Sequence, residues 1–319
     1  MEVQSGKEAM TPILGNDTEG IPFIQIGHHV LRLDLEDLDD HYKERAKCEL
    51  RETPEKRKES LDKFKKLIED EPNLVIPLDD DSYLLKFLRP CKFYEESAFK
   101  RMQRYYRFMA KNTKYTSNLM PSTVETVYAN EIIEFLPFRV KGSRVMILNI
   151  KNWNPKDVGV PLLFKSIIMA LEIAMIEPRT QVGGVHVILD MEGFTINHVM
   201  QFSPMVAKMI MDFVQDCAAT RLKGIHVVNQ PYVFNMAYQI FKPFIGQKLK
   251  SRLHFHGNKW ENLVDLIPKD FLLQKYGGSL ELNLNGVGEL LVEVLKYYEA
   301  DYEKLTHFGY GKELQVEQK

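Results

Sequence analysis

The sequence predicts an α/β protein in which an all-helical N-terminal domain is followed by an α/β domain with a mainly parallel sheet. Amphipathic helical patterns fill residues 35–118, and beyond residue 119 short β-branched runs alternate with helical stretches. Strands separated by helices are typical of parallel sheets with right-handed crossover connections. The chain of 319 residues is long enough for one large domain and a smaller companion.

Residues 1–34 are expected to form a flexible tail, because Gly, Pro and polar residues are mixed there without a period. In the helical domain, residues 35–118, Thr53 and Pro54 are typical of a helix N-cap and first helical position. A second helix should end before Pro90. A third should begin near Glu95 and bury apolar side chains at helical spacing.

Four short runs predict the strands of the second domain, residues 119–285; the first three are rich in Val, Ile and Leu, and the fourth alternates polar and apolar residues. They are residues 144–150, 185–190, 225–229 and 252–256. Helices with apolar stripes are expected between them, at 162–176 and at 204–216. The run "YGGSLELN" ends this domain, and residues 286–319 add an amphipathic helix at 288–304 and a tail.

Composition and charge narrow the class of protein. A net charge of −2 argues against a nucleic-acid-binding protein. Three widely spaced cysteines do not make a disulfide framework and favour a reducing compartment. The chain shows neither a signal-peptide pattern nor an apolar run long enough to cross a bilayer. We therefore expect a monomeric cytoplasmic protein.

The usual enzyme signatures are missing from the sequence. It contains no nucleophile elbow, no Walker phosphate loop and no dinucleotide-binding glycine motif after a strand. His254 and His256 share one face of a predicted strand, and His186 or His226 could supply a third metal ligand. Residues 217–260 contain no acid to orient these imidazoles. We favour structural histidines over a metal or catalytic site, and we expect no catalytic residue, no metal and no cofactor.

Two features of residues 217–260 do stand out. The stretch is free of acids but rich in cations; Lys248 and Arg252 share a helical face, and Arg221 and Lys223 share a strand face. This pattern favours either a clamp for a phosphate headgroup or a solvated basic face. Residues 231–246 carry one charge and are otherwise mostly apolar, which is typical of either a core helix or a lid over an apolar ligand.

Several motifs resemble the CRAL-TRIO family of lipid-binding and lipid-transfer proteins. They are "FLRPCKF" (87–93), "LDMEG" (189–193), the long run 222–257 from "LKGIHVVNQPYVF" to "SRLHFHG", and "IPKDFLLQKYGG" (267–278). The likeness spans roughly residues 40–285 and is greatest to the animal branch of tocopherol transfer protein, retinaldehyde-binding protein and the clavesins. It implies a sheet that floors a closed lipid cavity, a mobile helical gate and a basic cleft that binds phosphoinositides.

The resemblance also implies roles for individual residues. The hydrophobic ligand pocket would be lined by Phe164, Ile167, Leu171, Val185, Leu189, Ile210, Phe213 and Val214. The gate would present Val233, Phe234, Tyr238, Phe241 and Phe244, and the phosphoinositide cleft would contain Arg221, Lys223, Lys248 and Arg252. Two positions depart from the pattern. Apolar Ile167 and Leu171 replace serines of tocopherol transfer protein, which favours a more apolar ligand, and Cys91 stands where relatives often have Arg, with Arg89 and Lys92 as possible replacements.

The function hypothesis is an intracellular carrier of a hydrophobic small molecule of the tocopherol, retinoid, carotenoid or sterol class. It would transfer this ligand to phosphoinositide-containing membranes, in transient peripheral contact with endosomal or plasma membranes. One alternative is a phosphoinositide-binding trafficking adaptor without a transported ligand. The other is a lipid-modifying enzyme that uses His254 and His256.

Overall fold

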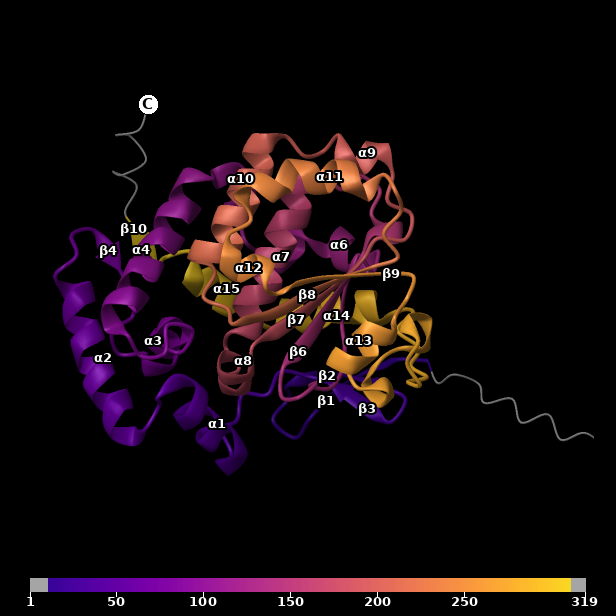
Figure 1. The fold of residues 1–319 in the computed structure, drawn as a ribbon. Helices are drawn as coiled ribbons and strands as arrows, with labels where there is room; N and C mark the ends of the chain where they lie inside the picture. The colour runs from indigo at the N-terminus through magenta and orange to yellow at the C-terminus, as the bar shows by residue number, and fades with distance from the viewer. Residues whose placement is uncertain (1–10, 311–319) are drawn as a thin grey trace, which may run out of the picture.

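A five-stranded sheet, with strand order β5-β6-β7-β8-β9, organises the computed structural model, which describes residues 11–310 (Figure 1). The strands are β5 (Ile133–Phe135), β6 (Arg144–Asn149), β7 (Val185–Asp190), β8 (Leu222–Val228) and β9 (Leu253–Gly257). Strands β6 to β9 are parallel, and β5 pairs antiparallel with β6 at the edge. The predicted fold class is therefore confirmed, and the four predicted runs correspond to β6, β7, β8 and β9.

Both faces of this sheet are covered, which is why its strands read as nearly continuous hydrophobic runs. All six residues of β6 are buried. On one face lie α7 (Val160–Ala174), α9 (Ile196–Val199), α10 (Pro204–Asp212), α11 (Phe234–Phe241) and α12 (Gln247–Lys250) (Figure 1). Helix α13 (Glu261–Leu266) lies beyond the other face, and α8 (Pro178–Gly183) leads into β7. The sheet thus has one face towards a group of helices that enclose space, as described below.

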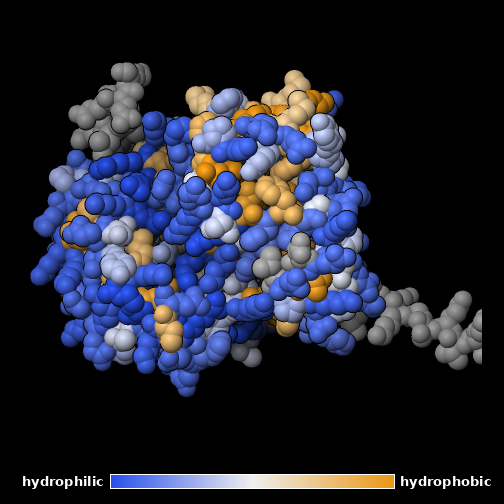
Figure 2. All heavy atoms as spheres, viewed as in Figure 1, coloured by the Kyte–Doolittle hydropathy of each residue, from blue (hydrophilic) through white to orange (hydrophobic). Residues whose placement is uncertain are grey.

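The N-terminal helices form a second hydrophobic cluster beside the sheet domain (Figure 1). They are α1 (Asp40–Leu50), α2 (Pro54–Glu69), α3 (Asp81–Leu88), α4 (Glu95–Lys111) and α5 (Thr113–Thr116). As predicted, Thr53 caps α2 by accepting a hydrogen bond from the Lys56 amide, 3.2 Å away. Phe164 from α7 also belongs to this cluster, so α7 joins the two parts of the molecule. The surface over the N-terminal helices is mostly hydrophilic in Figure 2.

A buried ion pair and a buried hydrogen bond also join the two parts. Arg89 on the helical side contacts Glu52 at 2.8 Å and donates to the Gln181 side chain of α8 at 2.7 Å. Lys86 pairs with Glu172 of α7, and both side chains are almost fully buried. Because removing one partner from such a pair leaves an unpaired buried charge, these contacts fix the helical part against α7 and α8.

The prediction of a flexible tail over residues 1–34 is wrong for most of its length. Residues 13–31 form an antiparallel sheet of β1 (Ile13–Asn16), β2 (Pro22–Ile26) and β3 (His29–Leu31). Ile24 and Ile26 are buried in the main core. The alternation in "PFIQI" is a period-two strand pattern that the surrounding Gly and polar residues obscured. Residues 1–10 lie outside the part of the chain that the structure describes.

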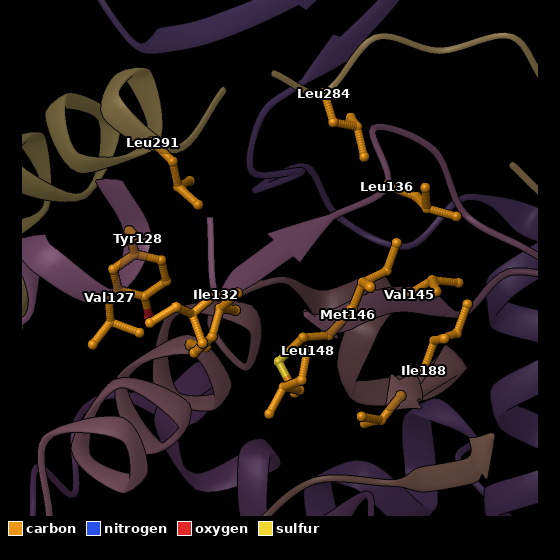
Figure 3. Close-up of a cluster of buried hydrophobic side chains, with 14 of the residues drawn as sticks. Val127, Tyr128, Ile132, Leu136, Val145, Met146, Leu148, Ile188, Leu284 and Leu291 are labelled. Carbon is orange, nitrogen blue, oxygen red and sulfur yellow. The ribbon is translucent and has the colours of Figure 1, made fainter. Parts of the chain in front are cut away.

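The C-terminal segment differs from prediction in a similar way. The expected single helix is two helices, α14 (Val287–Tyr297) and α15 (Glu299–Leu305), which meet at Tyr298. Strand β10 (Gly309–Tyr310) then pairs with β4 (Leu74–Val75), which returns the chain to the N-terminal helices. Near the edge strand β5, side chains of α14 and α6 (Glu125–Ala129) complete a core with those of β6, as the labelled Leu291, Tyr128 and Met146 show (Figure 3).

Candidate functional site

A cavity of about 300 Å³ lies between the sheet and the helices α7, α10 and α11. Its lining is apolar except for Thr220, Tyr238 and the indole of Trp153, whose N–H donates to the Val158 carbonyl at 2.6 Å. No charged side chain lies among these lining residues, all of which are in the described part of the chain. A ligand held here would find almost no polar partner, so its recognition would depend on shape and apolar contact.

Strand and helix periodicity place the lining side chains. On β7, Val185, Val187 and Leu189 alternate onto the cavity face. On β8 the register shifts by a bulge opposite Val185 and His186, which turns Ile225 and Val227 onto the same face. On α7, helical spacing directs Phe164, Ile167 and Leu171 inwards. These three elements form the floor and one wall of the cavity.

All of the predicted pocket residues line this cavity except Phe213, whereas their role in ligand binding stays a prediction. Ile210 and Val214 contribute from α10 and from the π-helical turn Phe213–Cys217 that follows it. The ring of Phe213 instead lies 5.1 Å from that of Phe108 on α4 and 5.3 Å from that of Phe164. The wide turn after α10 changes the helical phase, so Phe213 packs into the N-terminal cluster.

Helix α11 covers the cavity as a single layer. Phe234, Tyr238 and Phe241 line the cavity, while the opposite side of the segment exposes Met236 by 51% and the preceding Tyr232 by 90%. Ala237 is the only buried residue of the helix. Of the two alternatives for this segment, the core helix is therefore wrong: α11 has one face on the cavity and one towards solvent, as a lid would, and its role as a gate stays a prediction.

In the predicted gate segment, residues 231–246, the α-helix ends before the segment does. Helix α11 stops at Phe241, because Pro243 has no N–H to continue it, and a 3₁₀ turn follows at Lys242–Phe244. Gln215 fastens this end by donating to the Phe244 carbonyl at 3.0 Å and accepting from the Gly246 amide at 2.7 Å. Two of the predicted gate residues, Val233 and Phe244, are half-buried but do not line the cavity. Their side chains lie beside the cavity.

The four predicted cleft cations lie close to one another. Burial and then the charge of Arg252 lower the pKa of Lys248, and burial and then the charge of Arg221 lower the pKa of Arg252. Arg221 and Lys223 both contact Glu49 of α1, at 2.7 and 3.1 Å. Within residues 11–310, Lys248 and Arg252 have no ion pair. One half of the cluster therefore contacts a carboxylate, which balances one of its two positive charges, whereas the other half contacts none among the described residues.

Residues outside the predicted set add to this basic cluster. Arg101 of α4 and Lys92 both contribute to lowering the pKa of Lys248, after burial and Arg252. Arg101 donates to the Ala218 carbonyl at 2.7 Å, and its buried Nε has no hydrogen-bond partner among the described residues. Lys92 is exposed, but Arg89 is buried against Glu52. The expectation that Arg89 replaces the cation missing at Cys91 is therefore wrong.

The histidines form a row on the sheet face opposite the cavity. His186 Nδ1 lies 3.1 Å from His226 Nε2, and His226 Nδ1 lies 3.3 Å from His256 Nε2. His254 stacks on His226 with ring centroids 5.2 Å apart. The ring nitrogens meet in pairs, and within residues 11–310 no group of three or more His, Cys, Asp or Glu is arranged to hold a metal. The absence of a metal and of catalysis stays a prediction.

This histidine row should make stability depend on pH. Burial, then Lys223 and His254, lower the pKa of His186 from 6.5 to about 4, and burial, then His186, lowers that of His226 to about 3. Between these values and 6.5 the unfolded chain binds more protons, so the free energy of unfolding should fall as the pH drops from about 6.5 towards 4. His186→Asn should reduce this fall by roughly 2 kcal/mol.

Urea unfolding at a series of pH values measures the effect. His41→Asn, on the exposed side of α1, is the matched control and should keep the wild-type pH dependence. An unchanged slope in His186→Asn would show that the row does not control acid stability.

Comparison with known proteins identifies the family. The family model for the CRAL/TRIO domain matches residues 139–278. Alpha-tocopherol transfer protein-like from Homo sapiens is 30% identical over 237 residues, covering 74% of this chain and 69% of that protein. The chain belongs to the CRAL/TRIO family. Clavesin-1 of Rattus norvegicus is 26% identical over 242 residues (74% and 68% of the two chains), and clavesin-2 of Homo sapiens 26% over 243 (74% and 73%).

The CRAL/TRIO match covers the parallel strands β6 to β9, the cavity helices and the four predicted cleft cations, but not β5, α1 or α4. Sequence reasoning missed Phe255, although its signal was present: if His254 and His256 share a face of β9, Phe255 must face the cavity. It also missed Glu49 and Arg101. No local pattern marks these two, because they reach the cleft only through the packing of the N-terminal helices.

Proposed function

We propose that this CRAL/TRIO protein is a non-enzymatic carrier that binds one hydrophobic small molecule and delivers it to phosphoinositide-containing membranes. The observation that carries this proposal is the cavity of about 300 Å³ with no charged lining residue. Such a volume is within the range of small-molecule sites. The name of one relative, alpha-tocopherol transfer protein-like, agrees with a tocopherol as ligand. We propose the retinoid, carotenoid and sterol classes beside it because the lining of the cavity is almost entirely apolar.

A ligand in this cavity needs a way out. Burying about 15 methylene groups contributes on the order of 10 kcal/mol before the costs of binding, so release from a closed cavity would be slow. Helix α11 is the thinnest wall, with three rings on the cavity and the opposite side in solvent. In this proposal α11 is the gate, and an anionic membrane favours its opening if it binds the open state better.

The membrane-facing surface in this proposal surrounds the gate. Hydrophobic side chains are exposed on α9, on α10 and around α11, where orange residues gather in Figure 2. They are Ile196, Met200, Met205, Tyr232 and Met236. No helix within residues 11–310 is long and apolar enough to cross a membrane. We propose a cytoplasmic protein in transient peripheral contact with endosomal or plasma membranes.

Mass spectrometry of an organic extract of the purified protein tests the carrier function. A carrier should yield one hydrophobic compound in near-stoichiometric amount, and that compound should bind again to the stripped protein. If the extract is empty and retinoids, carotenoids, tocopherols and sterols all fail to bind, the carrier function is wrong.

The alternative, a phosphoinositide-binding adaptor, is favoured by the basic cluster, since this cluster could recruit the protein to a membrane without any bound ligand.

Hydrogen exchange should identify α11 as the gate. Opening segments come from the less stable parts of a fold, so amides of residues 234–241 should exchange faster than those of β7. Adding phosphoinositide vesicles should accelerate exchange in α11 and leave residues 185–190 unchanged. Equal protection in both segments, unaffected by vesicles, would make α11 a fixed part of the core.

A further inference from the structure

Glu49 is the only acid that contacts the four predicted cleft cations among the described residues. Residues 217–260, which supply those cations, contain no acid of their own. Glu49 comes instead from α1, more than 170 residues earlier. Its Oε2 accepts from Arg221 Nη2 at 2.7 Å and from Lys223 Nζ at 3.1 Å, while its Oε1 accepts from Arg45 Nε at 2.8 Å.

Arg221 and Lys223 hold the carboxylate of Glu49 in a way that would also suit a phosphate oxygen. Two cations converge on a single oxygen at charge-assisted hydrogen-bond distances, which is the arrangement that phosphates and carboxylates share. A phosphate monoester carries more charge, about −1.5 to −2, and more acceptor oxygens than a carboxylate. It is therefore the stronger ligand for the same pair of cations when it is held nearby.

Glu49 can leave this position without being buried elsewhere. Its side chain is 35% exposed, whereas those of Arg221 and Lys223 are 14% and 27% exposed. Arg221 is held independently by donating to the Val182 carbonyl, so it keeps its place when the carboxylate moves. Burial would raise the pKa of Glu49, but its hydrogen bonds to Arg221, Lys223 and Arg45 hold it at about 2. Acidification in the usual range therefore does not release it, whereas a competing anion does.

We propose that Glu49 is a built-in competitor that occupies the Arg221–Lys223 half of the cleft until a lipid headgroup phosphate displaces it. The other half, Lys248 and Arg252 with Arg101 nearby, contacts no carboxylate within residues 11–310 and takes the first phosphate. A headgroup with a second phosphate then exchanges with Glu49 and releases the contact between α1 and β8. This inference rests on the proposed phosphoinositide function and assigns its regulation.

Glu49→Gln tests the proposal, because it keeps the size of the side chain and removes its charge. The full chain is mixed with phosphatidylcholine vesicles, with or without phosphatidylinositol bisphosphate, and co-sedimentation gives the affinity. We expect Glu49→Gln to bind the phosphoinositide vesicles about threefold to tenfold more tightly than wild type, the range expected for loss of a competing ion pair. Glu44→Gln is the matched control, since Glu44 lies on the same helix but pairs with Lys47.

Calorimetry with soluble inositol trisphosphate separates the headgroup from the bilayer. The same gain with this probe shows that Glu49 competes with phosphate itself, whereas a gain with all vesicles, including those without phosphoinositide, overturns the proposal in favour of a general charge effect. Weaker or unchanged binding by Glu49→Gln, with a cooperative thermal transition retained, also overturns it. If neither wild type nor variant binds phosphoinositide in any form, the proposed phosphoinositide function is wrong. If wild type binds phosphoinositide and Glu49→Gln does not bind it more tightly, only the proposed role of Glu49 is wrong.

Discussion

Leu189→Arg is expected to abolish uptake of hydrophobic ligands. Leu189 projects from β7 into the cavity, where no lining residue carries a charge that could pair with a guanidinium. An unpaired charge in such a site costs several kcal/mol, and the longer side chain also fills space that the ligand needs. Affinity for any accepted retinoid, carotenoid or tocopherol should fall at least about a hundredfold.

Fluorescence titration with each ligand class measures this loss. Leu189→Met is the matched control, because it nearly conserves volume and apolarity and should bind like wild type. A cooperative thermal transition of Leu189→Arg shows that the variant is folded. If the folded variant takes up all of these ligands as well as wild type does, the cavity is not the ligand site.

Reversing the charge of Lys248 and Arg252 together should reduce binding to phosphoinositide vesicles by well over about tenfold. Each cation near an anionic surface contributes roughly 1 kcal/mol, and each reversal replaces attraction with repulsion. These two side chains have no ion pair among the described residues, so their full charge faces an incoming headgroup. Uptake of the hydrophobic ligand should survive, because neither side chain lines the cavity.

The measurement is co-sedimentation of Lys248→Glu/Arg252→Glu and wild type with vesicles, with and without phosphoinositide. The matched control reverses Lys58 and Lys66, two exposed lysines of α2, and so changes the net charge by the same amount. Wild-type binding should also weaken with added salt, because exposed charges are screened. Equal sedimentation of the cleft variant and the control variant would reduce the cluster to a solvated basic face.

Local periodicity made most of the fold predictable. The four central strands, the capped start of α2 and the stripe of Phe164, Ile167 and Leu171 each follow from a repeat of two or about 3.6 residues. The failures have equally physical causes. Residues 13–31 form strands too short for their alternation to stand out, and the wide turn at Phe213 shifts the helical phase without a sequence signal.

In the candidate site, too, the residues with a local sequence signal were predicted and those placed by tertiary packing were not. The acid-free stretch identified Arg221, Lys223, Lys248 and Arg252 because an anomaly in charge is visible in one segment. The acid that pairs with this segment could not be predicted. Glu49 is one of several acids on a charged helix, and only tertiary packing brings it to Arg221. Sequence reasoning thus predicted a basic cluster but not the carboxylate that contacts half of it.

The ion pair of Lys86 with Glu172 and the hydrogen bond from Arg89 to Gln181 bear on whether the two parts of this molecule can be separated. Excising the sheet domain would separate Glu172 from Lys86 and would expose to water the apolar face of α7 that packs against the N-terminal helices. The secondary structure thus changes in type near residue 118, but we do not expect the parts on either side of this junction to be stable independently of each other. We therefore expect the ligand cavity and the N-terminal helices to unfold together, so a substitution that loosens the helices should also loosen α7, the wall against which the ligand would rest.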